Sequence, residues 1–265
     1  MTVPPPHRYV FVGGLHRSGT SLLARLLAAH PAIGAIEGAP VPENEGCYLQ
    51  GAIPHTARHG VPAHFATDPA QHMTEGHPLD TLATRERLEA DWAPWFPQDT
   101  PWRVEKSPVN CTRTRLLQSL YPLAQFVIVT RHPAFVDQAM RKWGIGADAD
   151  FPAHWRAAHE TILGDVEHLH AAAVVRYEDL VADPDRTLAA LFAFLDLDPV
   201  PATEVVEDGN AAYADAARAS DAAYDRLGYL AGGKTAPFTP IVRHPLRAVR
   251  EKAVSLTPAS VRRPA

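Results

Sequence analysis

The sequence predicts an α/β protein in which a mostly parallel sheet lies between two layers of helices. Short apolar runs of strand type at 9–12 and 126–130 alternate with segments of helical periodicity, and a glycine-containing turn follows the first run. Each crossover helix brings the chain back to run in the same direction, which favours parallel strands. Ligand-binding residues are then expected at the carboxyl ends of the strands, near Gly13, Glu105, Arg131 and Tyr177.

The predicted elements follow in order, with one long interruption. Four leucines between 22 and 27 give a single apolar face to a helix over 19–29. Segment 38–100 is rich in Pro, Gly and His, which indicates an irregular insertion or lid with a short helix near 79–92. Regular elements then resume, as strands at 102–105, 126–130 and 173–176 and helices at 109–121, 133–143, 152–170 and 188–195.

The end of the chain is less regular in its pattern. A last helix is expected within 203–226, and an irregular tail over 232–265, where proline and arginine are frequent. We predict that residues 1–265 form one domain, since 265 residues suffice for one large α/β core. The architecture is therefore a three-layer domain with an irregular helical insertion after the first strand and helix.

The composition excludes several classes of partner. The net charge of −5 argues against nucleic acid or an anionic membrane, and no segment has the length and apolarity of a membrane span. Cys47 and Cys111 lie far apart without the spacing of metal ligands, which favours a reduced, cytoplasmic protein and no metal site. Only four lysines occur, at 106, 142, 234 and 252, so each is a candidate for a specific role.

The string Gly14-Leu-His-Arg-Ser-Gly-Thr-Ser21 stands between a strand and a helix, where main-chain N–H groups can cradle an anion. It is P-loop-like, because Gly14 and Gly19 have the spacing of the nucleotide triphosphatase pattern. However, Thr20 stands in place of that pattern's lysine, and Arg131 rather than a magnesium-binding aspartate follows the strand at 126–130. These differences argue against a P-loop kinase or NTPase, which remains one alternative.

Four segments in this order resemble the family of sulfotransferases that use 3′-phosphoadenosine 5′-phosphosulfate (PAPS), in its bacterial and tyrosylprotein-sulfotransferase-like branch. They are the loop itself and V-E-K-S-P, V-T-R-H-P and V-R-Y-E-D-L-V, starting at 104, 129 and 175. The resemblance implies transfer of a sulfuryl group from PAPS to a hydroxyl or amine, with adenosine 3′,5′-bisphosphate as the product. A non-catalytic nucleotide-binding protein of the same fold is the second alternative.

The resemblance also implies roles for individual residues. The 5′-phosphosulfate would be held by Arg17, Ser18, Gly19, Thr20 and Ser21. Arg131 would bind the 3′-phosphate and Tyr177 would lie beside the nucleotide. The family's serine eight residues after this arginine is replaced by Ala139, so Gln138, Arg141 or Lys142 is expected to compensate. The family's C-terminal R-K-G segment has only a faint counterpart at 232–234.

Transfer of a sulfuryl group needs stabilisation of the leaving oxygen and a base for the acceptor. Lys106 at a strand end is the candidate for the first task. Glu37, Glu45 and His55 are open alternatives for the base, with Glu43 beside them. Aromatic residues of the insertion suggest a partly apolar small-molecule, lipid or sugar acceptor. The sequence leaves the oligomeric state open.

Overall fold

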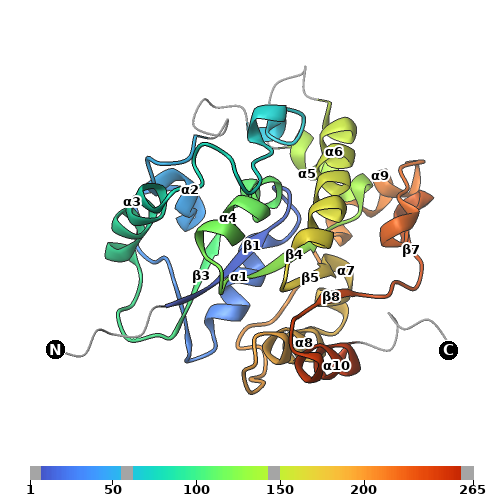
Figure 1. Cartoon of the computed structure of the whole chain (residues 1–265). Helices are drawn as coiled ribbons and strands as arrows, with labels where there is room; N and C mark the ends of the chain where they lie inside the picture. The colour runs from blue at the N-terminus through green and yellow to red at the C-terminus, as the bar shows by residue number, and fades with distance from the viewer. Residues whose placement is uncertain (1–6, 55–61, 143–149, 258–265) are drawn as a thin grey trace.

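The computed structural model describes residues 7–54, 62–142 and 150–257 (Figure 1). The described strands form a six-stranded sheet in the order β2-β3-β1-β4-β5-β8 and a separate pair, β6-β7. The neighbouring strands from β2 to β5 are parallel, and β8 is antiparallel to β5. The strands are β1 Arg8–Gly13, β2 Ile33–Ala35, β3 Trp102–Lys106, β4 Gln125–Thr130, β5 Ala172–Arg176, β6 Tyr229–Leu230, β7 Lys234–Thr235 and β8 Ile241–Arg243.

Helices follow most strands and cover both faces of the sheet (Figure 1). The α-helices are α1 Thr20–Ala28, α2 Gly46–Leu49, α3 Leu82–Trp92, α4 Thr114–Leu120, α5 Pro133–Arg141, α6 Phe151–Asp165, α7 Tyr177–Ala182, α8 Pro184–Phe194, α9 Ala214–Arg218 and α10 Arg247–Leu256. Short 3₁₀ turns, among them Pro42–Asn44 and Pro108–Thr112, connect them. The α/β fold with a mostly parallel sheet is confirmed.

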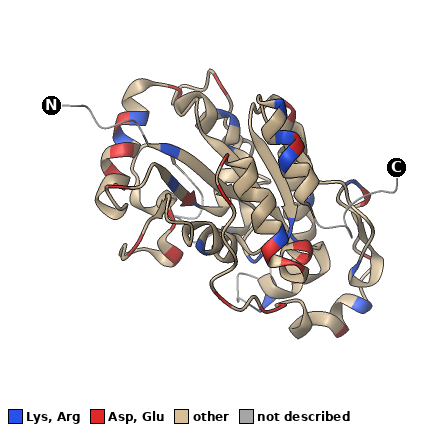
Figure 2. Cartoon of the chain, turned by 90° about the horizontal axis from the view of Figure 1, so that it is seen from below, with Lys and Arg blue, Asp and Glu red and all other residues tan. Residues whose placement is uncertain are grey.

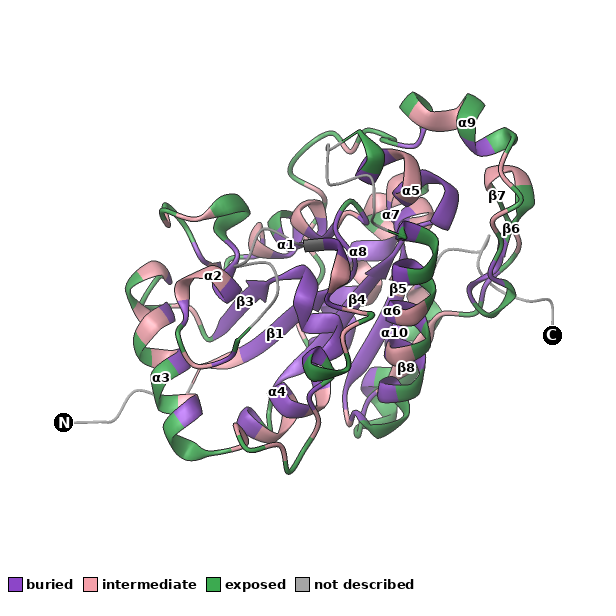
Figure 3. Ribbon diagram, turned by 90° about the horizontal axis from the view of Figure 1, so that it is seen from above, coloured by how far each residue is buried: buried purple, intermediate pink, exposed green. Residues whose placement is uncertain are grey.

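Alternation along the central strands divides the core in two. In β1, Tyr9 and Phe11 join a cluster with α3, α4 and α6, whereas Val10 and Val12 join a cluster with α1 and α8. This follows from the two-residue period of a strand, which points successive side chains to opposite faces. The central strands β3 and β4 are accordingly buried along their whole length, and β1 and β5 at all but one residue each (Figure 3).

Several expected boundaries differ from the structure. The helix expected over 109–121 is divided into the turn Pro108–Thr112 and α4. The strand β2 has no counterpart in the prediction, because three residues are too few to show periodicity. The helix expected within 203–226 is reduced to the five residues of α9. Trp143, expected on the inner face of the helix at 133–143, lies outside the described residues.

The expectation of an irregular tail over 232–265 is wrong in its middle part. The segment contains β8, which extends the sheet beside β5, and α10, which packs on α8. Only Val249 and Ala253 of α10 are buried, so its apolar face is too narrow to stand out in the sequence.

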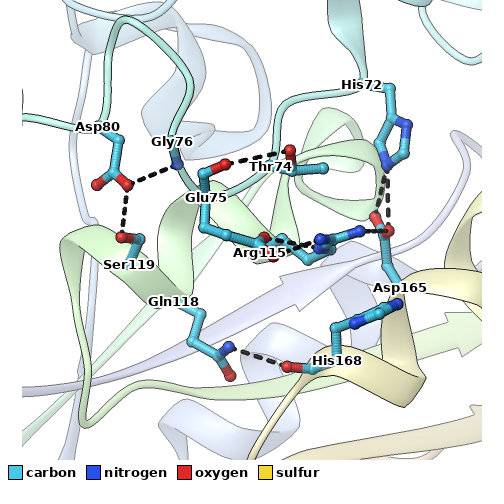
Figure 4. Close-up of polar contacts among 10 residues, drawn as sticks. All are labelled: His72, Thr74, Glu75, Gly76, Asp80, Arg115, Gln118, Ser119, Asp165 and His168. Carbon is cyan, nitrogen blue, oxygen red and sulfur yellow. Dashed lines mark hydrogen bonds and ion pairs between the residues drawn. The ribbon is translucent and has the colours of Figure 1, made fainter.

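The insertion is fastened to the sheet's helices by a polar network (Figure 4). His72 contacts both carboxylate oxygens of Asp165 at the end of α6, at 3.0 and 3.1 Å. Arg115 of α4 pairs with Glu75 through two hydrogen bonds and lies 3.6 Å from Asp165. These contacts hold the segment between the turn Pro69–Gln71 and α3 against α4 and α6.

None of the described helices is long and apolar enough to span a bilayer.

Candidate functional site

Three residues of the loop between β1 and α1 have a positive φ, and two of them are glycines. Gly14 has φ 144°, and a Cβ there would lie 2.3 Å from the carbonyl oxygen of Val129. Gly19 has φ 95°, and a Cβ there would lie 2.6 Å from the ring of Tyr177. Arg17 also adopts a positive φ of 65°, which is uncommon for a residue with a side chain. The glycine spacing thus serves close packing as well as the turn.

The loop opens into a cleft of about 550 Å³ at the carboxyl ends of β1 and β4. No side chain caps the N-terminus of α1, and its first turn carries no acidic residue, so its N–H groups and dipole favour an anion. Ser18 is fully buried, and its hydroxyl has no hydrogen-bond partner in the part of the chain that the structure describes. Of the predicted loop residues, those that line the cleft are Arg17, Gly19, Thr20 and Ser21.

Arg131 and Tyr177 form one wall of this cleft. The Arg131 guanidinium lies over the Tyr177 ring at 4.5 Å and is only 6 % exposed. Its Nη1 donates to the carbonyl oxygen of Arg17 at 2.8 Å, and its Nε donates to Oδ1 of Asn210 at 2.7 Å. Burial lowers the pKa of Arg131 from its ordinary value. The residue therefore supports the loop backbone in addition to supplying positive charge.

The segment 204–210, here called the acidic strap, covers this wall. The backbone N–H of Gly209 donates to the Tyr177 hydroxyl at 2.8 Å, and Glu204 pairs with Arg25 of α1 at 3.2 Å. Glu204 and Glu207 line the cleft together with Glu43 and Glu45, and so do the guanidinium groups of Arg17, Arg25 and Arg131. The two signs of charge are also interspersed over the rest of the ribbon (Figure 2). Positive charge for an anion is thus local to the cleft, as the net charge of −5 requires.

Lys106 and Glu45, two of the predicted catalytic residues, form a buried ion pair. Lys106 Nζ lies 2.9 Å from Glu45 Oε1, with exposed side-chain fractions of 6 % and 8 %. Burial raises the pKa of Glu45 to about 6, and the neighbouring Lys106 opposes that rise. Glu45 lines the first cleft, and Lys106 lines a second hollow that shares Ser21, Arg25 and Glu43 with it. A carboxylate and an ammonium group thus meet beside the loop between β1 and α1.

Two of the remaining predicted site residues, Glu37 and Lys142, are not among the described residues that line the main cleft. Glu37 is exposed and lines the second hollow with Lys106. Lys142 is exposed, lies 5.8 Å from the Tyr213 ring, and lines a separate hollow with Gln138 and Arg141. His55 lies outside the described residues. Among the candidate bases in the described residues, the structure therefore pairs Glu45 with Lys106, and Lys142 is not among the residues that line the main cleft.

Sequence reasoning missed two residues. His16 lines the cleft and is buried, and burial, with the nearby His154, Lys106 and Arg17, lowers its pKa to about 3. It is therefore neutral at pH 7 and able to hydrogen-bond to a ligand without adding charge. Its place inside the glycine-containing loop was the available signal. Glu105, which the sequence marks only as a strand end, is buried beside Lys106, and its hydrogen-bond partners are visible only in the tertiary structure.

The described residues contain no group of three or more His, Cys, Asp or Glu side chains suited to hold a metal ion. The predicted absence of a metal requirement stays a prediction.

Comparisons with known proteins point to one family. A model described as the sulfotransferase family matches residues 9–201. The sulfotransferase from Alicyclobacillus acidocaldarius is similar in structure, with a TM-score of 0.48 and 18 % identity, covering 80 % of this chain and 94 % of that one. The sulfotransferase domain of the Synechococcus PCC 7002 olefin synthase gives 0.44 and 20 %, covering 78 % and 82 %. A sulfotransferase from Mycobacterium tuberculosis H37Rv gives 0.44 and 22 %, covering 73 % and 68 %. No curated protein sequence matches the chain.

Proposed function

The chain belongs to the sulfotransferase family, and we propose that it transfers a sulfuryl group from PAPS to a hydroxyl or amine of a small-molecule, lipid or sugar acceptor. The observation that carries this proposal is the Lys106–Glu45 pair at 2.9 Å, beside a loop built for an anion. Cys47 and Cys111 carry free thiols, which favours the predicted cytoplasmic location.

The loop residues fit the phosphosulfate end of PAPS. The uncapped N-terminus of α1, the guanidinium of Arg17 and the hydroxyls of Thr20 and Ser21 would supply donors and positive charge to one anion. Arg131 and Tyr177 lie on the wall where the nucleoside would extend, and the acidic strap lies over them. We expect the strap to shift when the nucleotide binds, because Glu204 and Glu207 would otherwise repel its phosphates.

In the proposed reaction, the acceptor oxygen or nitrogen attacks sulfur while the bond from sulfur to the bridging oxygen breaks. Glu45 takes the acceptor's proton. Lys106 stabilises the negative charge that develops on the leaving phosphate, whose product is adenosine 3′,5′-bisphosphate. The two side chains pair with each other in the structure and would separate to engage these two partners. Positioning and electrostatics supply the rate enhancement, as in phosphoryl transfer.

The direct test is transfer from radiolabelled PAPS to a panel of acceptors: 4-nitrophenol, 1-octanol and octyl glucoside. Lys106→Ala is expected to lower kcat about 100-fold or more, because one stabilising donor is lost. Arg17→Ala is expected to weaken transfer as well. Lys252→Ala, on the exposed face of α10, is the matched control and should transfer at the parental rate. Full activity in both site variants would refute the assignment of the site.

A further inference from the structure

The two peptide groups that follow Glu45 are held by fixed partners. The N–H of Gly46 donates to Glu105 Oε1 at 3.0 Å, and the Gly46 carbonyl accepts from Trp92 Nε1 at 2.9 Å. The N–H of Cys47 donates to Ser107 Oγ at 3.0 Å. Each partner is itself buried in the core between the insertion and β3. The start of α2 is therefore fastened to the end of β3.

Glu45 and Gly46 contact two successive residues at the end of β3. Lys106 and Glu105 are neighbours in β3, and successive strand residues point to opposite faces of the sheet. Glu45 contacts Lys106 on one face, and Gly46 contacts Glu105 on the other. Holding Gly46 against Glu105 therefore fixes where the preceding residue can place its carboxylate.

The approach of Gly46 to Glu105 is too close for any other residue. A Cβ on Gly46 would lie 2.6 Å from Glu105 Oε1 and 2.9 Å from Trp92 Nε1. Real Cβ contacts are not found at such distances, so the absence of a side chain is a requirement of this contact.

Glu105 is a buried carboxyl group that accepts three hydrogen bonds. It is 1 % exposed and accepts from Gly46 N–H, from Ser107 Oγ at 2.6 Å and from Asn110 Nδ2 at 2.5 Å. Asn110 also reaches the carbonyl oxygen of Val12 in β1 at 3.4 Å. Burial raises the pKa of Glu105, while the hydrogen bonds from Ser107 and Asn110, the charge of Lys106 and the Gly46 N–H lower it. A buried carboxyl group with this many partners is a built feature of the strand end.

We propose that Glu105 is a positioning residue. By accepting the hydrogen bond of the Gly46 N–H, it holds the Glu45 carboxylate beside Lys106, where Glu45 can take the proton of the acceptor. This inference rests on the proposed sulfuryl transfer, in which Glu45 is the base. Glu105 does not touch the substrate. It acts through the main chain of the residue after the base.

The charge of Glu105 has a second effect in the same direction. The groups that face Glu45 are Lys106 and Glu105 from β3, Glu43 from the turn Pro42–Asn44, and the Cys47 thiol from α2. After burial, which is the largest cause, the negative charges of Glu105 and Glu43 raise the pKa of Glu45, while Lys106 lowers it. Removing the charge at 105 should then leave Glu45 a weaker base.

The test uses Glu105→Gln in the full chain. The amide keeps the size of the side chain but loses its charge, and its N–H group faces Asn110 Nδ2 in place of Oε2. The hydrogen bond from the Gly46 N–H should weaken as a result, so Gly46 should move from β3. We expect kcat for transfer from PAPS to fall about 100-fold, as for a catalytic group displaced by about 1 Å. The Kd for adenosine 3′,5′-bisphosphate, measured by calorimetry, should stay at the parental value because the anion loop is untouched. The acid limb of the pH profile of kcat/KM should move to lower pH.

A double variant separates positioning from general damage. In the Glu45→Gln background, Glu105→Gln should cause no further loss of kcat, since the base through which it acts is gone. A multiplicative loss would overturn the proposal. Gly46→Ala displaces the same segment while keeping the charge of Glu105, and should reproduce the fall in kcat if Glu105→Gln does not fold. Glu251→Gln, which makes the same change from carboxylate to amide on the exposed surface of α10, is the control and should keep the parental kcat.

A crystal structure of Glu105→Gln tests the positioning role without an activity assay. The proposal requires the separation of Lys106 Nζ and Glu45 Oε1 to exceed about 4 Å, the limit of an ion pair. An unchanged pair would overturn the positioning role even if the parent transfers sulfate. If the parent transfers nothing to any acceptor but the pair separates in the variant, the proposed function fails and the positioning role stands.

Discussion

The chemistry of Glu45 depends on its surroundings. The pKa of an exposed glutamate lies far below neutral pH, so its carboxylate is a weak base at pH 7. Burial of its side chain raises the pKa to about 6, close to a working pH at which a general base is effective. Lys106 at 2.9 Å opposes that rise and prevents a larger one. The pair is therefore tuned by burial and charge together.

The pH dependence of transfer follows from this raised pKa. Below about pH 6 Glu45 takes up a proton and no longer accepts one from the acceptor, so kcat/KM should fall about tenfold per pH unit there. Above that pH the carboxylate is ionised, and kcat/KM should no longer change with pH. Glu45→Gln should remove this limb and lower kcat by about 10² or more. A Glu45→Gln enzyme that keeps the same limb would show that another group is the base, with Glu37 the next to examine.

Gly19 links the anion loop to Tyr177. Gly19→Ala places a methyl group at φ 95°, 2.6 Å from the Tyr177 ring, so both backbone strain and a clash are expected. The cost should be about 1–3 kcal/mol, and binding of adenosine 3′,5′-bisphosphate should weaken. Thermal unfolding and calorimetry measure the two effects. Gly164→Ala in α6, where a Cβ meets nothing within 4 Å, is the control and should not lower the Tm. Equal Tm values for both variants would contradict this account.

At the scale of elements, the insertion depends on a few anchors. It has short helices and turns, so its own hydrogen bonds supply little cooperativity. The network around Asp165 supplies a fixed point, because that carboxylate is buried and faces both His72 and Arg115 (Figure 4). Burial is the main effect on the pKa of Asp165 and raises it, while His72 and Arg115 lower it.

Asp165→Asn tests this anchor. The change leaves the Arg115 guanidinium with Glu75 alone and weakens the contact to His72, and should lower the free energy of unfolding by about 2 kcal/mol. Urea denaturation measures it. The Kd for adenosine 3′,5′-bisphosphate should not change, because Asp165, His72 and Arg115 are not among the residues that line the cleft. Glu251→Gln, which removes an exposed pair with Arg247, is the control and should leave the midpoint unchanged. A similar loss in both variants would contradict an anchoring role.

The end of the chain acts at the same scale. β8 extends the sheet and α10 covers α8, so 241–256 completes one layer of the domain although its sequence pattern is weak. The acidic strap lies between α8 and α9, and its contacts to Arg25, Arg131 and Tyr177 tie that part of the chain to the cleft.

At the scale of the whole molecule, recognition of the nucleotide must overcome a net charge of −5. Adenosine 3′,5′-bisphosphate should stabilise the protein by about 2.7 kcal/mol at 100 times its Kd. AMP, which lacks the 3′-phosphate, should raise the Tm much less at the same concentration. Increasing salt should reduce the difference, since charge pairing is screened. Equal shifts for the two nucleotides would contradict the assignment of Arg131 to the 3′-phosphate.

The sequence by itself determined the α/β class, the strands at the centre of the sheet, the anion loop at 14–21 and the resemblance to sulfotransferases. These features are local: buried strands require continuous apolar runs, and a tight loop requires glycine at fixed positions. Only the tertiary structure decided which candidate base meets Lys106, how Arg131 is used, and what covers Tyr177. Glu45 and Lys106 are 61 residues apart, and Arg131 and Asn210 are 79 apart. Such contacts form where separate segments fold onto the same strand ends, and no spacing within one segment encodes them.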